Sequence, residues 1–108
     1  KVEKVDETNP DVYDALARKY LNITCSVMSP NESRRTYIGQ MIDEYQIDGV
    51  LEIVLQSCHT YAVEADLIKR YVTEEKHLPY LNIETDYSQA DSGQINTRLE
   101  AFLETIMP

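Results

Sequence analysis

The amino-acid sequence predicts an α/β fold, a partial parallel sheet flanked by helices in the order α-α-β-α-β-α. Two short apolar runs, residues 49–56 and 80–85, have the length and the bounding turn residues of buried strands, and the segments around them show helical spacing. A strand, a helix and a second strand in succession imply a right-handed parallel crossover. A doubly wound sheet normally has about four to six strands. We therefore expect residues 1–108 to be a single carboxyl-terminal domain, or part of a larger Rossmann-like or flavodoxin-like domain.

Two helices are expected before the first strand. Residues 1–8 are charged and show no clear period, so we interpret them as a tail or a truncated connection. Asn9-Pro10 then supplies a capping side chain and a proline, which favour a helix start. The turn Ser29-Pro30-Asn31 precedes the second helix. The apolar stripes are Val12, Tyr13, Leu16, Ala17, Tyr20 and Leu21 in the first helix, and Tyr37, Ile38, Met41, Ile42 and Tyr45 in the second.

The second half of the chain alternates strands and helices. A third helix follows Cys58, and His77-Leu78-Pro79 ends it before the second strand. A polar loop, residues 86–93, leads to the last helix. The expected buried stripes are Ala62, Ala65, Ile68, Tyr71 and Val72 in the third helix, and Ile95, Leu99, Phe102, Leu103 and Ile106 in the fourth.

Charge and cysteine content exclude several classes of function. The formal net charge is -9, from 19 acidic and 10 basic residues. Such a surface is repelled by phosphate backbones and by anionic lipids, so we expect neither nucleic acid nor membrane as a partner. Two cysteines are too few for a disulfide scaffold, which favours a reducing cytoplasm.

Cys58 is the principal candidate for chemistry. It lies at the carboxyl end of the first strand and at the start of a helix, where open α/β sheets bind ligands and where a helix amino terminus favours the thiolate. Cys58 is then a metal or cluster ligand, a nucleophile, or a small buried side chain. His59 follows it directly, either as the base of a Cys–His pair or as a hydrogen-bonding neighbour that caps the helix or supports a ligand.

Glu84 and Asp86 are the second candidates, because they end the other strand at the same edge of the sheet. They could orient a polar substrate, exchange a proton, or cap the last helix. Cys25 lies in an irregular segment and receives no role. Two cysteines cannot hold a cubane cluster by themselves, and the absence of a Cys-x-x-Cys spacing disfavours structural zinc.

The second half of the chain carries a dense, ordered pattern. It consists of Asp48-Gly-Val-Leu51, Leu55-Gln-Ser-Cys58-His59, Glu64, Leu78-Pro-Tyr-Leu-Asn-Ile-Glu-Thr-Asp-Tyr87 and Gln94-Ile-Asn-Thr-Arg-Leu-Glu-Ala-Phe-Leu-Glu104. This pattern resembles the carboxyl end of the 2-hydroxyacyl-CoA dehydratase and benzoyl-CoA reductase subunit family. The sequence also resembles that family in the stretch 11–20 and at Arg34 or Arg35.

The resemblance implies an iron–sulfur enzyme. Dehydratase subunits of this family hold a [4Fe-4S] cluster through three cysteines, with one iron site open. Cys58 matches the last of the three, and two further ligands are expected outside this chain, so the isolated segment is expected to be inactive. An ATP-dependent iron–sulfur activator protein delivers one electron, and a homologous second subunit completes the enzyme. (R)-2-hydroxyacyl-CoA is then dehydrated to 2-enoyl-CoA through a ketyl radical.

Two alternatives remain at this point. The first is a benzoyl-CoA reductase-type subunit, which uses the same kind of cluster to reduce a ring. The second is a non-catalytic α/β subunit-contact module, in which Cys58 is buried and the apolar helix faces meet a partner.

Overall fold

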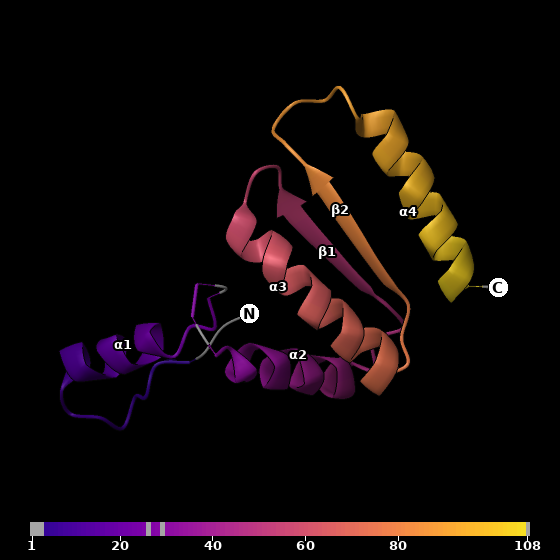
Figure 1. The fold of residues 1–108 in the computed structure, drawn as a ribbon. Coiled ribbons are helices and arrows are strands. Elements are labelled where there is room, and N and C mark those ends of the chain that lie inside the picture. The colour runs from indigo at the N-terminus through magenta and orange to yellow at the C-terminus, as the bar shows by residue number, and fades with distance from the viewer. Residues whose placement is uncertain (1–3, 26, 29, 108) are drawn as a thin grey trace.

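The computed structural model describes residues 4–25, 27–28 and 30–107 and confirms the predicted order of elements (Figure 1). Helices and strands alternate as expected, and the third helix continues into a short π-helical turn. The elements are α1 (Val12–Leu21), α2 (Glu32–Tyr45), β1 (Val50–Leu55), α3 (His59–Arg70), η1 (Tyr71–Glu75), β2 (Tyr80–Thr85) and α4 (Ser92–Ile106).

β1 and β2 form a two-stranded parallel sheet in which Val50 pairs with Tyr80 and Leu55 with Thr85. The Val50 amide donates to the Pro79 carbonyl at 2.9 Å, and the Gln56 amide donates to the Thr85 carbonyl at 2.7 Å. The backbone groups of alternate residues in a strand face opposite edges of that strand. The even-numbered residues of β1 therefore face β2, and the odd-numbered residues face the other edge.

The core lies on one face of the sheet, between α2, α3 and η1. Ile42 of α2, Ile68 of α3 and Val72 of η1 are buried together, and Val50 and Tyr80 of the strands pack against them. Side chains alternate across a strand, so Val50 and Tyr80 mark the face that α2 and α3 share. α2, which precedes β1, and α3, which precedes β2, thus cover the same side of the sheet.

The opposite face is covered only in part. Figure 1 shows α4 running beside β2. A Cβ atom added at Gly49 would lie 2.7 Å from Ile106 Cδ1 and 3.0 Å from Phe102 Cζ, so α4 approaches the start of β1 with no room for a larger residue there. Ile83 of β2 is buried on this face, whereas Ile53, its neighbour on β1, is 63% exposed.

The amino-terminal part of the chain extends away from the sheet as an arm that carries α1 (Figure 1). The helix begins at Val12, two residues later than the Asn9-Pro10 pattern predicts. Asp11 is its N-cap, because the Asp11 side chain accepts from the amides of Tyr13 and Asp14. None of the residues in the predicted apolar stripe is buried, and Ala15, outside that stripe, is the one buried residue of α1. The periodicity of α1 therefore marks a face that the described chain leaves uncovered.

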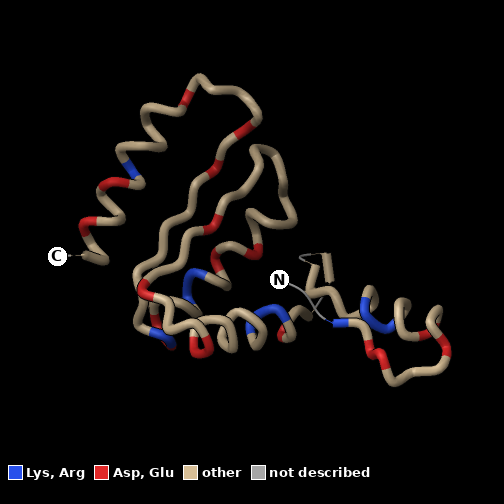
Figure 2. Tube along the Cα trace, turned by 180° about the vertical axis from the view of Figure 1, so that it is seen from behind, with Lys and Arg blue, Asp and Glu red and all other residues tan. Residues whose placement is uncertain are grey.

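Charged residues are dispersed over the molecule. Figure 2 shows acidic positions on the arm, the strands and the helices, not gathered on one face. In the described part of the chain, no helix combines the length and the apolar character that a membrane span requires.

Substitution of Val72 tests the core. Val72 has no exposed surface, so we expect Val72→Ala to lower the free energy of unfolding by about 2 kcal/mol through lost burial and a residual cavity. Val63→Ala is the matched control, since Val63 is 73% exposed on α3, and it should change stability by less than about 0.5 kcal/mol. Urea unfolding measures both. Equal effects of the two substitutions would contradict this placement of the core.

Candidate functional site

Cys58 lies where the sequence predicts, in a tight turn between β1 and α3. Ser57 has a φ of 66°, a left-handed conformation that is uncommon for a residue with a side chain. The Cys58 amide donates to the Leu55 carbonyl at 2.9 Å, and the Cys58 carbonyl accepts from the Ala62 amide at 3.0 Å. Cys58 is thus the N-cap of α3, and its half-buried thiol is not disulfide-bonded.

His59 is the first residue of α3 and is exposed. In the described residues no hydrogen bond joins it to Cys58, so the structure contains no preformed Cys–His pair. His59 instead borders a groove of about 890 Å³ on the outer side of α3. The apolar part of the groove consists of Val27, Met28, Pro30, Val63, Leu67 and Ile68.

Glu84 and Asp86 share a second hollow, of about 400 Å³, at the carboxyl ends of the strands. β2 ends at Thr85, so Asp86 lies just beyond it. Hydrogen bonds from Ser88 lower the pKa of Asp86, and the Ser88 amide donates to Asp86 Oδ1 at 2.6 Å. Asp86 therefore closes a local turn. Glu84 is exposed, and its carboxylate is less engaged in hydrogen bonds than that of Asp86. Cys58 does not line this hollow.

Metal-binding capacity is limited in this segment. Within the described residues, no group of three or more His, Cys, Asp or Glu side chains is placed to hold a metal ion. Cys58 supplies one thiolate, and Cys25, also half-buried and free, lies in the loop before α2. A cluster at Cys58 would need further ligands from outside the described chain.

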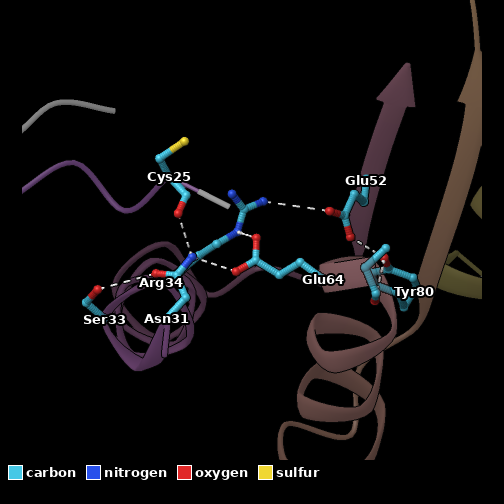
Figure 3. A network of polar contacts seen from close by, with 8 residues as sticks. Cys25, Asn31, Ser33, Arg34, Glu52, Glu64 and Tyr80 are labelled. Carbon is cyan, nitrogen blue, oxygen red and sulfur yellow. Dashed lines mark hydrogen bonds and ion pairs between the residues drawn. The ribbon is translucent and has the colours of Figure 1, made fainter. Parts of the chain in front are cut away.

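A largely buried polar network, not predicted from the sequence, joins α2, β1 and α3 (Figure 3). The Arg34 guanidinium lies between two carboxylates, 3.3 Å from Glu64 Oε2 through Nε and 3.7 Å from Glu52 Oε1 through Nη2. The three side chains are only 17%, 9% and 10% exposed, respectively. The Tyr61 ring lies 4.9 Å from the Arg34 guanidinium carbon. Two carboxylates, one on β1 and one on α3, thus share one cation from α2.

Asn31 and Tyr80 extend this network in opposite directions. The Asn31 side chain donates to Glu64 Oε1 at 2.6 Å and to the Cys25 carbonyl at 2.9 Å, which fastens the Cys25 loop to α3. The Tyr80 hydroxyl donates to Glu52 Oε2. Burial, followed by this contact with the Glu52 carboxylate, raises the pKa of Tyr80. The network therefore spans α2, both strands and α3.

The sequence does contain a sign of this network. Glu52 interrupts an otherwise apolar strand, and Glu64 lies one residue before the buried Ala65 on α3. A carboxylate at such a position is almost never fully buried without a partner. The identity of that partner could not be inferred, because Arg34 and Arg35 are adjacent on α2 and only one of them faces inward.

Removal of the Arg34 charge should be costly. We expect Arg34→Met to lower the free energy of unfolding by about 3–5 kcal/mol, because two buried carboxylates lose their cation. Arg35→Met is the matched control: Arg35 is 48% exposed and pairs on the surface with Glu32 and Glu75, so its loss should cost less than about 1 kcal/mol. Urea unfolding at neutral pH compares them. Adding Glu64→Gln to Arg34→Met should recover stability; no recovery would argue against charge as the cause.

Tyr80 should make stability depend on alkaline pH. Its pKa is raised in the folded chain, so its stabilising contribution is complete below the ordinary value of 10.0 and declines as pH rises towards the folded value. We expect Tyr80→Phe to cost about 1.5–3 kcal/mol at pH 8, through the lost hydrogen bond to a carboxylate. The difference from the unmodified chain should shrink by at most about 1 kcal/mol between pH 10 and 11, because half of the unfolded tyrosine is already ionised at pH 10 and the side chain is partly exposed to solvent. Urea unfolding across this range tests it, and a constant difference would contradict it.

Comparison with known proteins reveals consistent relatives. The family profile described as "2-hydroxyglutaryl-CoA dehydratase, D-component" matches residues 1–106. The Escherichia coli (strain K12) protein named "Putative dehydratase subunit YjiM" is 56% identical over 96 residues, which make up 89% of this chain and 25% of that protein. The (R)-phenyllactyl-CoA dehydratase beta subunit of Clostridium sporogenes is 31% identical over 94 residues, 86% of this chain and 25% of that subunit.

A third relative is the beta subunit of (R)-2-hydroxyglutaryl-CoA dehydratase from Acidaminococcus fermentans. It is 27% identical over 74 residues, which are 68% of this chain and 19% of that subunit. The chain thus spans a quarter or less of these relatives. Because the family profile extends over nearly all of its residues, the chain belongs to the 2-hydroxyglutaryl-CoA dehydratase D-component family.

Proposed function

We propose that this chain is part of a subunit of an iron–sulfur dehydratase that converts an (R)-2-hydroxyacyl-CoA to a 2-enoyl-CoA. The observation that carries the proposal is the position of Cys58, a free cysteine between the carboxyl end of a parallel strand and the amino end of a helix, in a chain that belongs to this family. Two of the relatives are named as dehydratases of (R)-2-hydroxyacyl-CoA thioesters.

Cys58 is suited to the role of one cluster ligand. Hydrogen bonds with Leu55 and Ala62 fix the position of the Cys58 backbone at the amino end of α3. A [4Fe-4S] cluster bound there would supply one-electron transfer and a Lewis-acidic iron. This segment offers one thiolate, so the other two cysteine ligands would come from outside this chain.

Two neighbouring side chains are candidates for the substrate side. His59 projects from the same helix end into the groove with Val27 and Met28, where a polar group beside apolar walls could orient a thioester. Glu84 is the better acidic candidate at the strand ends, because Asp86 is already engaged by Ser88. Both roles are proposals for the assembled enzyme.

The proposed enzyme requires partners. Two of the relatives are named as beta subunits, which supports a second, homologous subunit. The ATP-dependent iron–sulfur activator protein would deliver the electron.

The test is anaerobic iron and sulfide analysis with electron paramagnetic resonance on the full-length subunit together with its partner. We expect Cys58→Ala to abolish the cluster signal of this subunit, because a ligand is lost. Cys25→Ala is the matched control, since Cys25 is equally free and half-buried, and it should retain the signal. Retention of the cluster in Cys58→Ala would remove Cys58 from the site.

Activity distinguishes the proposed reaction from its alternatives. The complete enzyme, with activator and ATP, should form 2-enoyl thioesters from (R)-phenyllactyl-CoA or (R)-2-hydroxyglutaryl-CoA. Ring reduction of benzoyl-CoA in place of dehydration would assign the reductase-type function. A native subunit without any cluster would favour the non-catalytic contact module.

A further inference from the structure

Two apolar surfaces of this chain are exposed, and they match in length. The first is the stripe of α1 in which Val12, Leu16 and Tyr20 recur every four residues. The second is the groove on the outer side of α3, where Val63 and Leu67 are exposed at the same spacing. At about 1.5 Å per residue, the 10 residues of α1 and the 12 residues of α3 span about 15 and 18 Å. A helix with the stripe of α1 therefore fits along α3.

The ends of the two surfaces carry complementary charge. α1 has an acidic first turn, which contains Asp14, and a basic last turn, which contains Lys19. The groove is acidic where α3 ends, because Glu74 and Glu75 line it there. The other end of the groove, at His59, is the amino end of α3 and carries partial positive charge. A helix like α1 that lies parallel to α3 therefore places unlike charges together at both ends.

Two of these charges are unpaired in the part of the chain that the structure describes. Lys19 and Glu74 form no ion pair there. Arg70, at the same end of the groove as Glu74, is paired with Asp66 at 3.0 Å. The parallel alignment brings the unpaired cation of α1 to the unpaired carboxylate of the groove.

The loop before α2 ties the chain's own α1 to a different part of the groove. Asn31 donates to Glu64 and to the Cys25 carbonyl, so Cys25 is held beside the first half of α3. α1 ends only four residues earlier. The backbone between them is turned rather than extended, since the Ile23 amide donates to the Tyr20 carbonyl at 3.2 Å. The carboxyl end of the chain's own α1 therefore stays near Glu64.

This tether works against the complementary alignment within one chain. Glu74 lies ten residues beyond Glu64, which is about 15 Å along the helix. Even four fully extended residues span at most about 14 Å. If the chain's own α1 ran along α3 in the opposite direction, Asp14 would approach Glu74, and like charges repel each other. An α1 from another molecule is free of this tether.

We propose that the groove on the outer side of α3 binds α1 of a second copy of this subunit, parallel to α3, with Lys19 of the second copy facing Glu74. The extended arm supports this occupant, because α1 projects away from its own sheet (Figure 1). A two-fold axis lets each copy place its α1 on the other, which closes the assembly. The second copy then forms a wall of the groove that His59 borders. The inference does not rest on the proposed dehydration.

Sedimentation of the full-length subunit over a range of concentrations tests the charge contact. We expect Lys19→Glu and Glu74→Lys each to weaken self-association by about two- to twentyfold, because each dimer contains two such pairs. The double variant should recover the association, since the pair is restored with its charges exchanged. Lys69→Glu is the matched control: Lys69 is an exposed cation of α3 outside the groove, and its replacement should leave the association unchanged.

Anaerobic crosslinking with a short bis-maleimide identifies the occupant. A full-length subunit with Leu16→Cys is mixed with a differently tagged copy that carries Leu67→Cys, and we expect a crosslinked dimer that contains both tags. The unmodified subunit controls for its native cysteines. Leu103→Cys in place of Leu16→Cys is the matched control, because Leu103 is a half-exposed leucine on α4, and it should give no such dimer.

Four results would overturn the proposal. Crosslinking of Leu16→Cys to Leu67→Cys only when one chain carries both would show that the chain's own α1 fills the groove. A crosslink only to the homologous subunit would assign the groove to that protein. Absence of any crosslink would leave α1 elsewhere, and a crosslink without any effect of Lys19→Glu would contradict the parallel alignment. None of these results bears on iron binding at Cys58, so failure here is distinguishable from failure of the proposed function.

Discussion

The arrangement of α2, the sheet and α3 depends on one buried cation. Arg34 lies between the carboxylates of Glu52 and Glu64, and no other basic side chain in the described part of the chain pairs with either carboxylate. Buried charges are tolerated only when they are paired, and loss of one partner leaves the others uncompensated. The contacts of Arg34 Nε are ionic rather than aligned hydrogen bonds, since Nε and Glu64 Oε2 have no hydrogen-bond partner. Loss of Arg34 would therefore leave both carboxylates without a cation, which is costly even where an intact buried network adds little net stability.

This constraint connects the fold to the candidate site. Glu64 lies on the helix that Cys58 begins, and Asn31 bridges Glu64 to the Cys25 carbonyl. The loop before α2 is thereby fixed beside α3, where it forms one wall of the groove that His59 borders. The turn at Ser57 is held separately, by the hydrogen bond from the Cys58 amide to Leu55. Cys58 thus lies at a hydrogen-bonded junction between β1 and α3.

The uncovered surfaces have a common physical meaning. The arm with α1, the outer side of α3 at Val63 and the open side of β1 expose large apolar residues. Large apolar surfaces of this kind, where they are contiguous, are typical of contact sites. The chain also spans a quarter or less of the relatives that it matches.

Local sequence determined the elements and the junction at Cys58. Strand length, helical period and turn residues act over a few neighbours, so the α-α-β-α-β-α order and the strand-to-helix position of Cys58 were predictable. The start of α1 was not predictable, because Asn9 and Asp11 both have side chains that can cap a helix. Only the Asp11 side chain accepts hydrogen bonds from the first amides of α1. Tertiary structure decided which arginine is buried, Arg34 rather than Arg35, and paired it with Glu52 and Glu64. It also decided that Cys58 lies apart from the hollow that Glu84 and Asp86 share. Such contacts depend on how distant elements pack, which no local period records.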